Sequence, residues 1–144
     1  MQVKSDSRAA RQRRGMPIAL LVARVLFASI FILAAPRHFT SEAVTHAAEL
    51  GVPFARFVVP LAGAMAMIGG LGVLAGYQTR WSAVLLVAFL VPVTFGMHRF
   101  WESTDPTAFA VQRAMFFKNV ALVGGALAIA CAGAGAWSLD VGLR

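Results

Sequence analysis

Four apolar stretches, each about 20 residues long, constrain this chain more than any other feature. They lie at about residues 17–35, 54–76, 81–98 and 114–136. A helix of ~20 residues is long enough to cross the ~30 Å hydrocarbon core of a bilayer. Only 13% of the residues are charged, whereas a soluble domain carries roughly 25%. We therefore predict an all-α protein, a transmembrane four-helix bundle.

A short helix is predicted between the first two spans. Pro36 ends the first span, and residues 40–42 (Thr-Ser-Glu) supply a hydroxyl cap and an acidic first turn. Gly51 is a typical helix stop. The segment 41–50 is too short to cross a bilayer, and its apolar and polar residues lie on different sides. We expect this helix to lie in the membrane interface.

Residues 1–15 are polar and strongly basic, with no apolar periodicity. We predict a disordered tail there, followed by a single membrane domain over residues 16–144. A basic tail can bind nucleic acid, but next to an apolar segment it more often marks the cytoplasmic side of a span. We therefore expect the lipid bilayer and no nucleic acid as partner. Because the number of spans is even, both termini are predicted to be cytoplasmic.

The residues that join the third and fourth spans form the candidate functional site. Charged groups at membrane depth are costly and usually face protein or water. Helical spacing places His98 and Trp101 on one face of the third span, and Gln112 and Asn119 on one face of the fourth. A lysine can snorkel to the interface, but Asn119 has no long stem and needs hydrogen-bond partners. The predicted ligand-binding residues, in a polar and aromatic pocket at the external face, are His98, Trp101, Gln112, Lys118 and Asn119.

Arg24 and Asp140 are predicted to be structural charges. Arg24 lies about two turns into the first span from its basic end. It can reach the cytoplasmic headgroups or pair with Asp140, which the predicted topology places on the same side.

Metal and disulfide chemistry are not predicted for this chain alone. His38, His46 and His98 fall on the same predicted face, but no pair has a metal-ligand spacing such as H-x-x-x-H. The alternative, that they are solvated histidines of the interface, stays open. Cys131 is the single cysteine, so no intramolecular disulfide can form.

Small residues four apart in the second span indicate close helix packing. Gly72 and Gly76 form a G-x-x-x-G pair, which lets two helix backbones approach each other. We expect this approach within the bundle, and a homo-oligomer is the alternative.

Several short motifs, taken in chain order, form a more specific pattern. They are Arg24, Gly51-Val52-Pro53, Gly69-Gly70, Gly76-Tyr77-Gln78-Thr79-Arg80, His98-Arg99-Phe100-Trp101, Asp105-Pro106, Phe117-Lys118-Asn119, Gly124-Gly125 and Ser138-Leu139-Asp140. Together they resemble the DoxX family of small four-span bacterial membrane proteins. Many family members carry a glutamate just before the glycine pair of the second span. Residues 64–68 contain no acid here, so we expect no mechanism that depends on that carboxylate.

The resemblance implies a function in broad terms. Relatives include a subunit of a thiosulfate:quinone oxidoreductase and a scaffold that joins redox and sulfur-handling enzymes. It therefore implies a bacterial inner-membrane protein that is an oxidoreductase component, a subunit of a quinone- or sulfur-linked redox complex. Quinone would be a substrate, and no intrinsic cofactor is expected. The alternative is a non-catalytic scaffold, or a protein that handles small solutes or cargo, because a fold alone does not transfer an activity.

Overall fold

The computed structural model describes residues 2–142, with side chains described from Pro17 onward. These residues form helices and connections, without strands. The elements are α1 (Gln2–Ala34), the 3-10 helix η1 (Ala35–Phe39), α2 (Ser41–Glu49), α3 (Ala55–Ala75), α4 (Thr79–Met97), the 3-10 helix η2 (Phe100–Glu102), α5 (Pro106–Ala132) and α6 (Leu139–Gly142).

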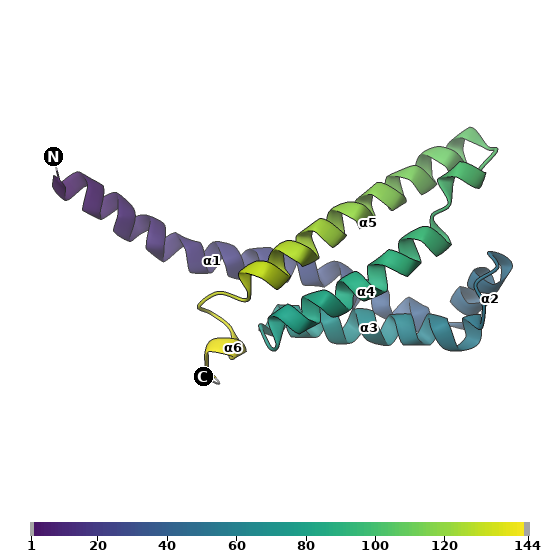
Figure 1. Cartoon of the computed structure of the whole chain (residues 1–144), viewed down its shortest axis with the longest axis horizontal. Coiled ribbons are helices and arrows are strands. Elements are labelled where there is room, and N and C mark those ends of the chain that lie inside the picture. Colours follow the sequence, from purple (N-terminus) through teal and green to yellow (C-terminus); the bar gives the residue numbers. More distant parts are fainter. Residues whose placement is uncertain (1, 143–144) are drawn as a thin grey trace.

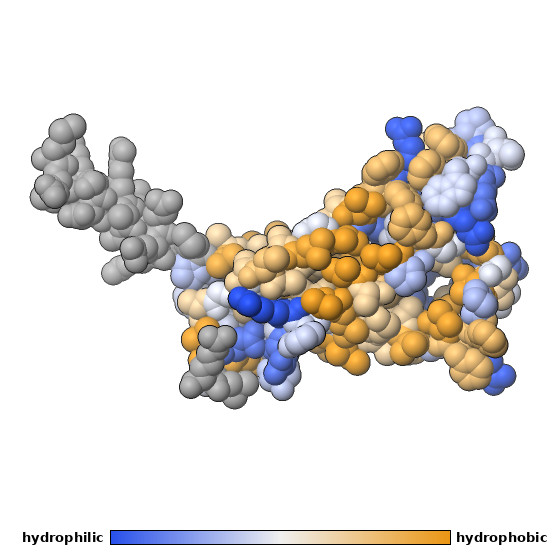
Figure 2. Space-filling model, in the orientation of Figure 1, coloured by the Kyte–Doolittle hydropathy of each residue, from blue (hydrophilic) through white to orange (hydrophobic). Residues whose placement is uncertain are grey.

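Four helical segments are long and apolar enough to cross a membrane, which confirms the predicted fold class. They are Pro17–Phe39, Ala55–Ala75, Thr79–Glu102 and Pro106–Ala132. α1 packs along α3, α3 along α4, and α4 along α5. In Figure 1, α5 diverges from α3 toward its first turns. Apolar residues cover much of the face shown in Figure 2, as expected for a surface in contact with lipid.

The core between α1, α3 and α4 is packed closely because glycines and small side chains face larger ones. Leu86, Val73 and Ala28 are fully buried there. A Cβ atom built on Gly72 would lie 2.1 Å from Oγ of Ser82. The close approach that the glycine spacing predicts is therefore made within the bundle.

The short helix predicted between the first two spans is confirmed as α2. Its cap is Thr40, whose hydroxyl accepts a hydrogen bond from the N–H of Ala43 at 3.3 Å. Ala47 of α2 is buried against Ala55 and Val59 at the start of α3. This contact fixes α2 against the end of the second span, while its position in a membrane interface stays a prediction.

α1 begins at Gln2, so the helix includes most of the segment for which the composition predicts a disordered tail. Alanine, arginine and glutamine are frequent in this segment, and all three have high helix propensity. A helix that continues from the first span can therefore extend into polar sequence. Met1 and the side chains up to residue 16 lie outside the described part of the chain.

α5 begins eight residues earlier than predicted and ends at Ala132 rather than near residue 136. The reason is local: the carboxylate of Asp105 accepts a hydrogen bond from the N–H of Ala108 at 2.7 Å, and Pro106 occupies the first turn. An Asp cap followed by proline starts a helix whether or not the following residues are apolar. The connection expected to contain about fifteen residues is therefore reduced to residues 98–105, which include η2.

Candidate functional site

The predicted site lies where α4, η2 and the first half of α5 meet. His98 caps the C-terminal end of α4, and its N–H donates to the carbonyl of Thr94 at 3.2 Å. Because α5 starts early, Gln112 already lies within a regular helix. Nδ1 of His98 and Oε1 of Gln112 are 2.9 Å apart. This hydrogen bond joins the third and fourth spans by their side chains, as the predicted pocket requires.

An aromatic cluster adjoins this pair. Phe100 of η2 lies 5.2 Å from the ring of Trp101 and 5.4 Å from that of Phe116, both edge-to-face. Trp101 and Phe116 are themselves 5.9 Å apart, again edge-to-face. Phe116 is one turn after Gln112 and shares its face of α5. Trp101 is 52% exposed, so the cluster offers an accessible aromatic wall beside the polar pair.

Lys118 and Asn119 are not brought into this cluster. Asn119 is buried on the face of α5 that packs on the bundle, but two turns, or ~10 Å, beyond Gln112. Lys118 is exposed on a different side of the same helix. The structure therefore unites His98, Trp101 and Gln112, and places the other two predicted residues elsewhere.

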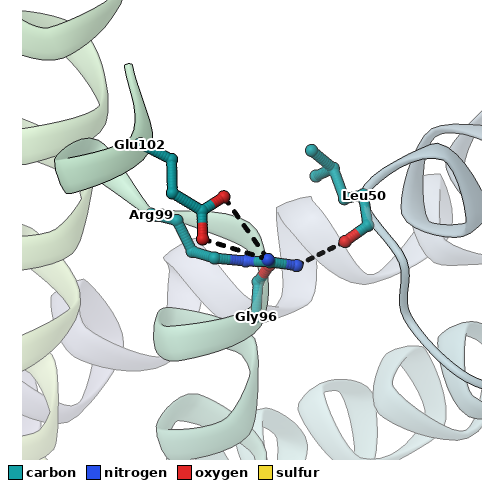
Figure 3. A network of polar contacts seen from close by, with 4 residues as sticks. All are labelled: Leu50, Gly96, Arg99 and Glu102. Carbon is teal, nitrogen blue, oxygen red and sulfur yellow. Dashed lines mark hydrogen bonds and ion pairs between the residues drawn. The ribbon is translucent and has the colours of Figure 1, made fainter.

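Arg99 forms a polar network at the same end of the molecule (Figure 3). Its Nε donates to the carbonyl of Gly96 at 3.2 Å, and Nη1 donates to Glu102 at 3.3 Å. Nη2 donates to the carbonyl of Leu50, in the connection between α2 and α3. Arg99 thereby ties η2 to a segment 49 residues away in the sequence. Sequence spacing gives no signal for such a contact, because Leu50 takes part through its backbone.

The opposite end of the bundle contains the two predicted structural charges. Arg24 is 4% exposed and donates from Nη2 to the carbonyl of Trp137, so it is buried rather than extended to the headgroups. The carboxylate of Asp140 accepts hydrogen bonds from the N–H groups of Gln78 at 2.7 Å and Thr79 at 3.0 Å. Asp140 therefore caps the start of α4 and holds the C-terminal segment against it.

The geometry for a metal site is not found among the described residues, where no three His, Cys, Asp or Glu side chains come together. A hollow of about 420 Å³ lies on α5 and borders the aromatic cluster, because Phe109 and Phe117 are 5.7 and 6.3 Å from the ring of Phe100. It is lined by Phe109, Ala110, Arg113, Ala114 and Phe117. None of the five predicted ligand-binding residues lines it.

Comparison with known proteins identifies the family. The DoxX family model matches residues 19–99, more than half of the 144 residues. The chain belongs to the DoxX family. The match covers the first three spans of this DoxX protein and ends at Arg99, so Gln112 lies beyond it.

Two relatives extend the similarity over most of the DoxX chain. Inner membrane protein YqjF of Escherichia coli strain K12 is 34% identical over 125 residues, which cover 85% of this chain and 90% of the relative. Inner membrane protein YphA of the same strain is 31% identical over 126 residues, which cover 86% and 89%. No solved structure matches. Both names and the four apolar spans support an inner-membrane location, while the side on which the termini lie stays a prediction.

Proposed function

We propose that this DoxX protein is a subunit of a membrane redox complex and binds the head group of a quinol beside His98. The observation that carries the proposal is the hydrogen bond of 2.9 Å between His98 and Gln112, at the edge of a partly exposed aromatic cluster. It places a proton-accepting group beside an aromatic wall. In the proposed membrane position, a quinol dissolved in the bilayer reaches both.

The proposal gives each nitrogen of His98 a role. The carbonyl oxygen of the Gln112 amide can only accept, so Nδ1 of a neutral His98 is the donor. Nε2 is then left with a free lone pair. A quinol hydroxyl can donate to this lone pair and pass its proton to the imidazole when the quinol is oxidised. Gln112 holds the tautomer and the orientation of the ring, and so acts as a positioning residue.

The aromatic cluster is suited to the quinol ring. Trp101 and Phe116 meet edge-to-face, and both present ring surface next to the polar pair. Aromatic contacts of this kind contribute about 0.5–1.5 kcal/mol beyond the burial of apolar area. The apolar outer faces of α4 and α5 continue into the bilayer, where the tail of the quinol would stay in lipid.

A partner subunit is needed to take the electrons. Oxidation of a quinol releases two protons and two electrons; His98 accepts one proton, and the second passes to water at the exposed edge of the site beside Trp101. With Cys131 as its single cysteine, this chain cannot exchange electrons through a dithiol pair of its own. We assign the electron acceptor to a redox protein that docks at the same end of the bundle.

Purified protein in mild detergent allows a test with a short-tailed ubiquinone analogue and its reduced form. We expect the quinol to raise the melting temperature of the wild type more than the quinone does. His98→Gln and Gln112→Leu should each lose this shift. His46→Gln is the matched control, because His46 is an exposed histidine of α2. A wild type without a shift, or an unchanged shift in His98→Gln, would contradict the proposal.

A non-catalytic scaffold is the second candidate, and the Arg99 network favours it. Nε, Nη1 and Nη2 of Arg99 donate to oxygens of Gly96, Glu102 and Leu50. They hold η2 and the connection between α2 and α3 together as a fixed rim. If the rim binds a partner protein, Arg99→Gln should reduce the recovery of that partner from membranes without changing the quinol-induced shift.

A further inference from the structure

The hollow on α5 combines a cation, two aromatic rings and two alanines. The guanidinium carbon of Arg113 lies 5.9 Å from the ring centroid of Phe109. α5 contains no aspartate or glutamate, and Arg113 forms no ion pair with the side chains described, those of residues 17–142. Phe117 is 56% exposed on the other side of the hollow. In the hollow, the positive charge of Arg113 therefore lies next to apolar side chains and is not paired with a carboxylate of residues 17–142.

The length of α5 is compatible with a position of Arg113 at the level of the lipid headgroups. α5 has 27 residues, which correspond to ~40 Å and exceed the ~30 Å of the hydrocarbon core. The other end of the helix is marked by Arg80, whose Nε would lie 3.8 Å from a Cβ atom on Gly133. About 20 residues, or ~30 Å, separate Arg113 from Ala132. Arg113 and Arg80 are thus separated along α5 by about the thickness of the hydrocarbon core.

Small exposed residues continue from the hollow toward the middle of the membrane. Ala114, Ala121 and Gly124 are exposed and recur at helical spacing along this face of α5. A Cβ atom on Gly124 would have no atom within 4 Å. The distance from Ala114 to Gly124 is ~15 Å, about half the thickness of the hydrocarbon core. We call the line of these three residues the furrow; its length corresponds to about one leaflet.

We propose that the hollow and the furrow bind an anionic phospholipid, with the phosphate at Arg113 and one acyl chain along the furrow. The charge argues for this occupant over a second copy of the chain. In a parallel pair of α5 helices packed along the furrow, Arg113 of one copy would approach Lys118 of the other, and the two cations would repel. An anionic headgroup is attracted to the same charge. This proposal does not depend on the quinol site.

Native mass spectrometry of the purified full chain can test this assignment. The probes are phosphatidylglycerol and phosphatidylcholine with identical palmitoyl and oleoyl chains, titrated separately. We expect the first phosphatidylglycerol to bind more tightly than the first phosphatidylcholine. Arg113→Gln should weaken phosphatidylglycerol about fivefold and should bring the two lipids close together in affinity. Ala121→Phe fills the furrow without removing the charge and should also weaken phosphatidylglycerol.

Arg56→Gln is the matched control, because it removes the same charge from an exposed arginine at the start of α3. We expect it to retain the affinity of the wild type for the first phosphatidylglycerol. Equal affinity of the wild type for both lipids, or equal losses in Arg113→Gln and Arg56→Gln, would overturn the site. Disulfide cross-linking between the Cys131 residues of two copies, with phosphatidylglycerol binding unaffected by Ala121→Phe, would assign the furrow to a second copy and would also overturn it.

Discussion

The contacts of single residues around η2 differ in how well the sequence predicts them. The pairing of His98 with Gln112 could be expected, because helical spacing and an antiparallel neighbour bring both to the same level. Arg99 could not be assigned in this way, since two of its acceptors are the backbone carbonyls of Gly96 and Leu50. A backbone acceptor leaves no signal in the sequence. The tertiary structure was therefore needed to show that Arg99 binds carbonyls of its own chain.

Arg99 is expected to contribute more to stability than its ion pair suggests. Arg99→Gln removes the charged donor from two carbonyls, and we expect a loss of about 1.5–3 kcal/mol in the free energy of unfolding in mixed micelles. Glu102→Gln should cost less than about 1 kcal/mol, because the Glu102 side chain is 57% exposed and solvent screens the pair. Equal losses in the two variants would show that the ion pair, rather than the carbonyl contacts, holds η2.

Arg24 is expected to stabilise the bundle through the C-terminal segment. Arg24→Met removes the hydrogen bond to the carbonyl of Trp137 and the cation near Asp140, and should lower the free energy of unfolding by about 1.5–3 kcal/mol. Arg24→Lys should lose less, because an ammonium group can still donate to that carbonyl. Denaturation of both variants in mixed micelles measures the difference. A fully stable Arg24→Met would contradict this role.

At the scale of elements, the sequence predicts the helices better than their ends. The apolar runs located all four spans, because the bilayer requires a minimum length of continuous helix. The start of α5 was misplaced because apolarity was given more weight than the cap formed by Asp105 and Pro106. The same error placed Gln112 in the predicted connection, whereas the structure places it in the regular helix α5, which gives its amide a fixed direction toward His98.

Gly76 and Gly124 differ in their surroundings, because Gly76 is closely packed and Gly124 lies on an open surface. Gly76 has φ +68°, and a Cβ atom there would lie 2.1 Å from Nη1 of Arg24. Gly76→Ala should therefore lower the free energy of unfolding by about 2 kcal/mol or more. Gly124→Ala is the control, since nothing lies within 4 Å of its Cβ position, and it should stabilise α5 by about 0.5–1 kcal/mol. Similar effects of the two substitutions would contradict the described packing of α3.

At the scale of the whole molecule, the orientation follows from the basic segment before the first span. We predict that the termini are cytoplasmic and that α2 and η2 are external. In a Cys131→Ser background, single cysteines at positions 46 and 103 should react with an impermeant reagent in intact spheroplasts, and one at position 5 should not. The opposite pattern would invert the molecule and would place the His98 site on the cytoplasmic side.

In the whole molecule, His98, Gln112 and the aromatic cluster lie together at one end of the apolar bundle, and the central claim is that a quinol binds there. Photolabelling in native membranes with a short-tailed azido-quinone tests this most directly. We predict that the label attaches to the peptides that contain Trp101 and Phe116, that excess unlabelled quinol prevents it, and that His98→Gln reduces it. Label spread evenly over the lipid-facing helices, with no competition by quinol, would contradict the account.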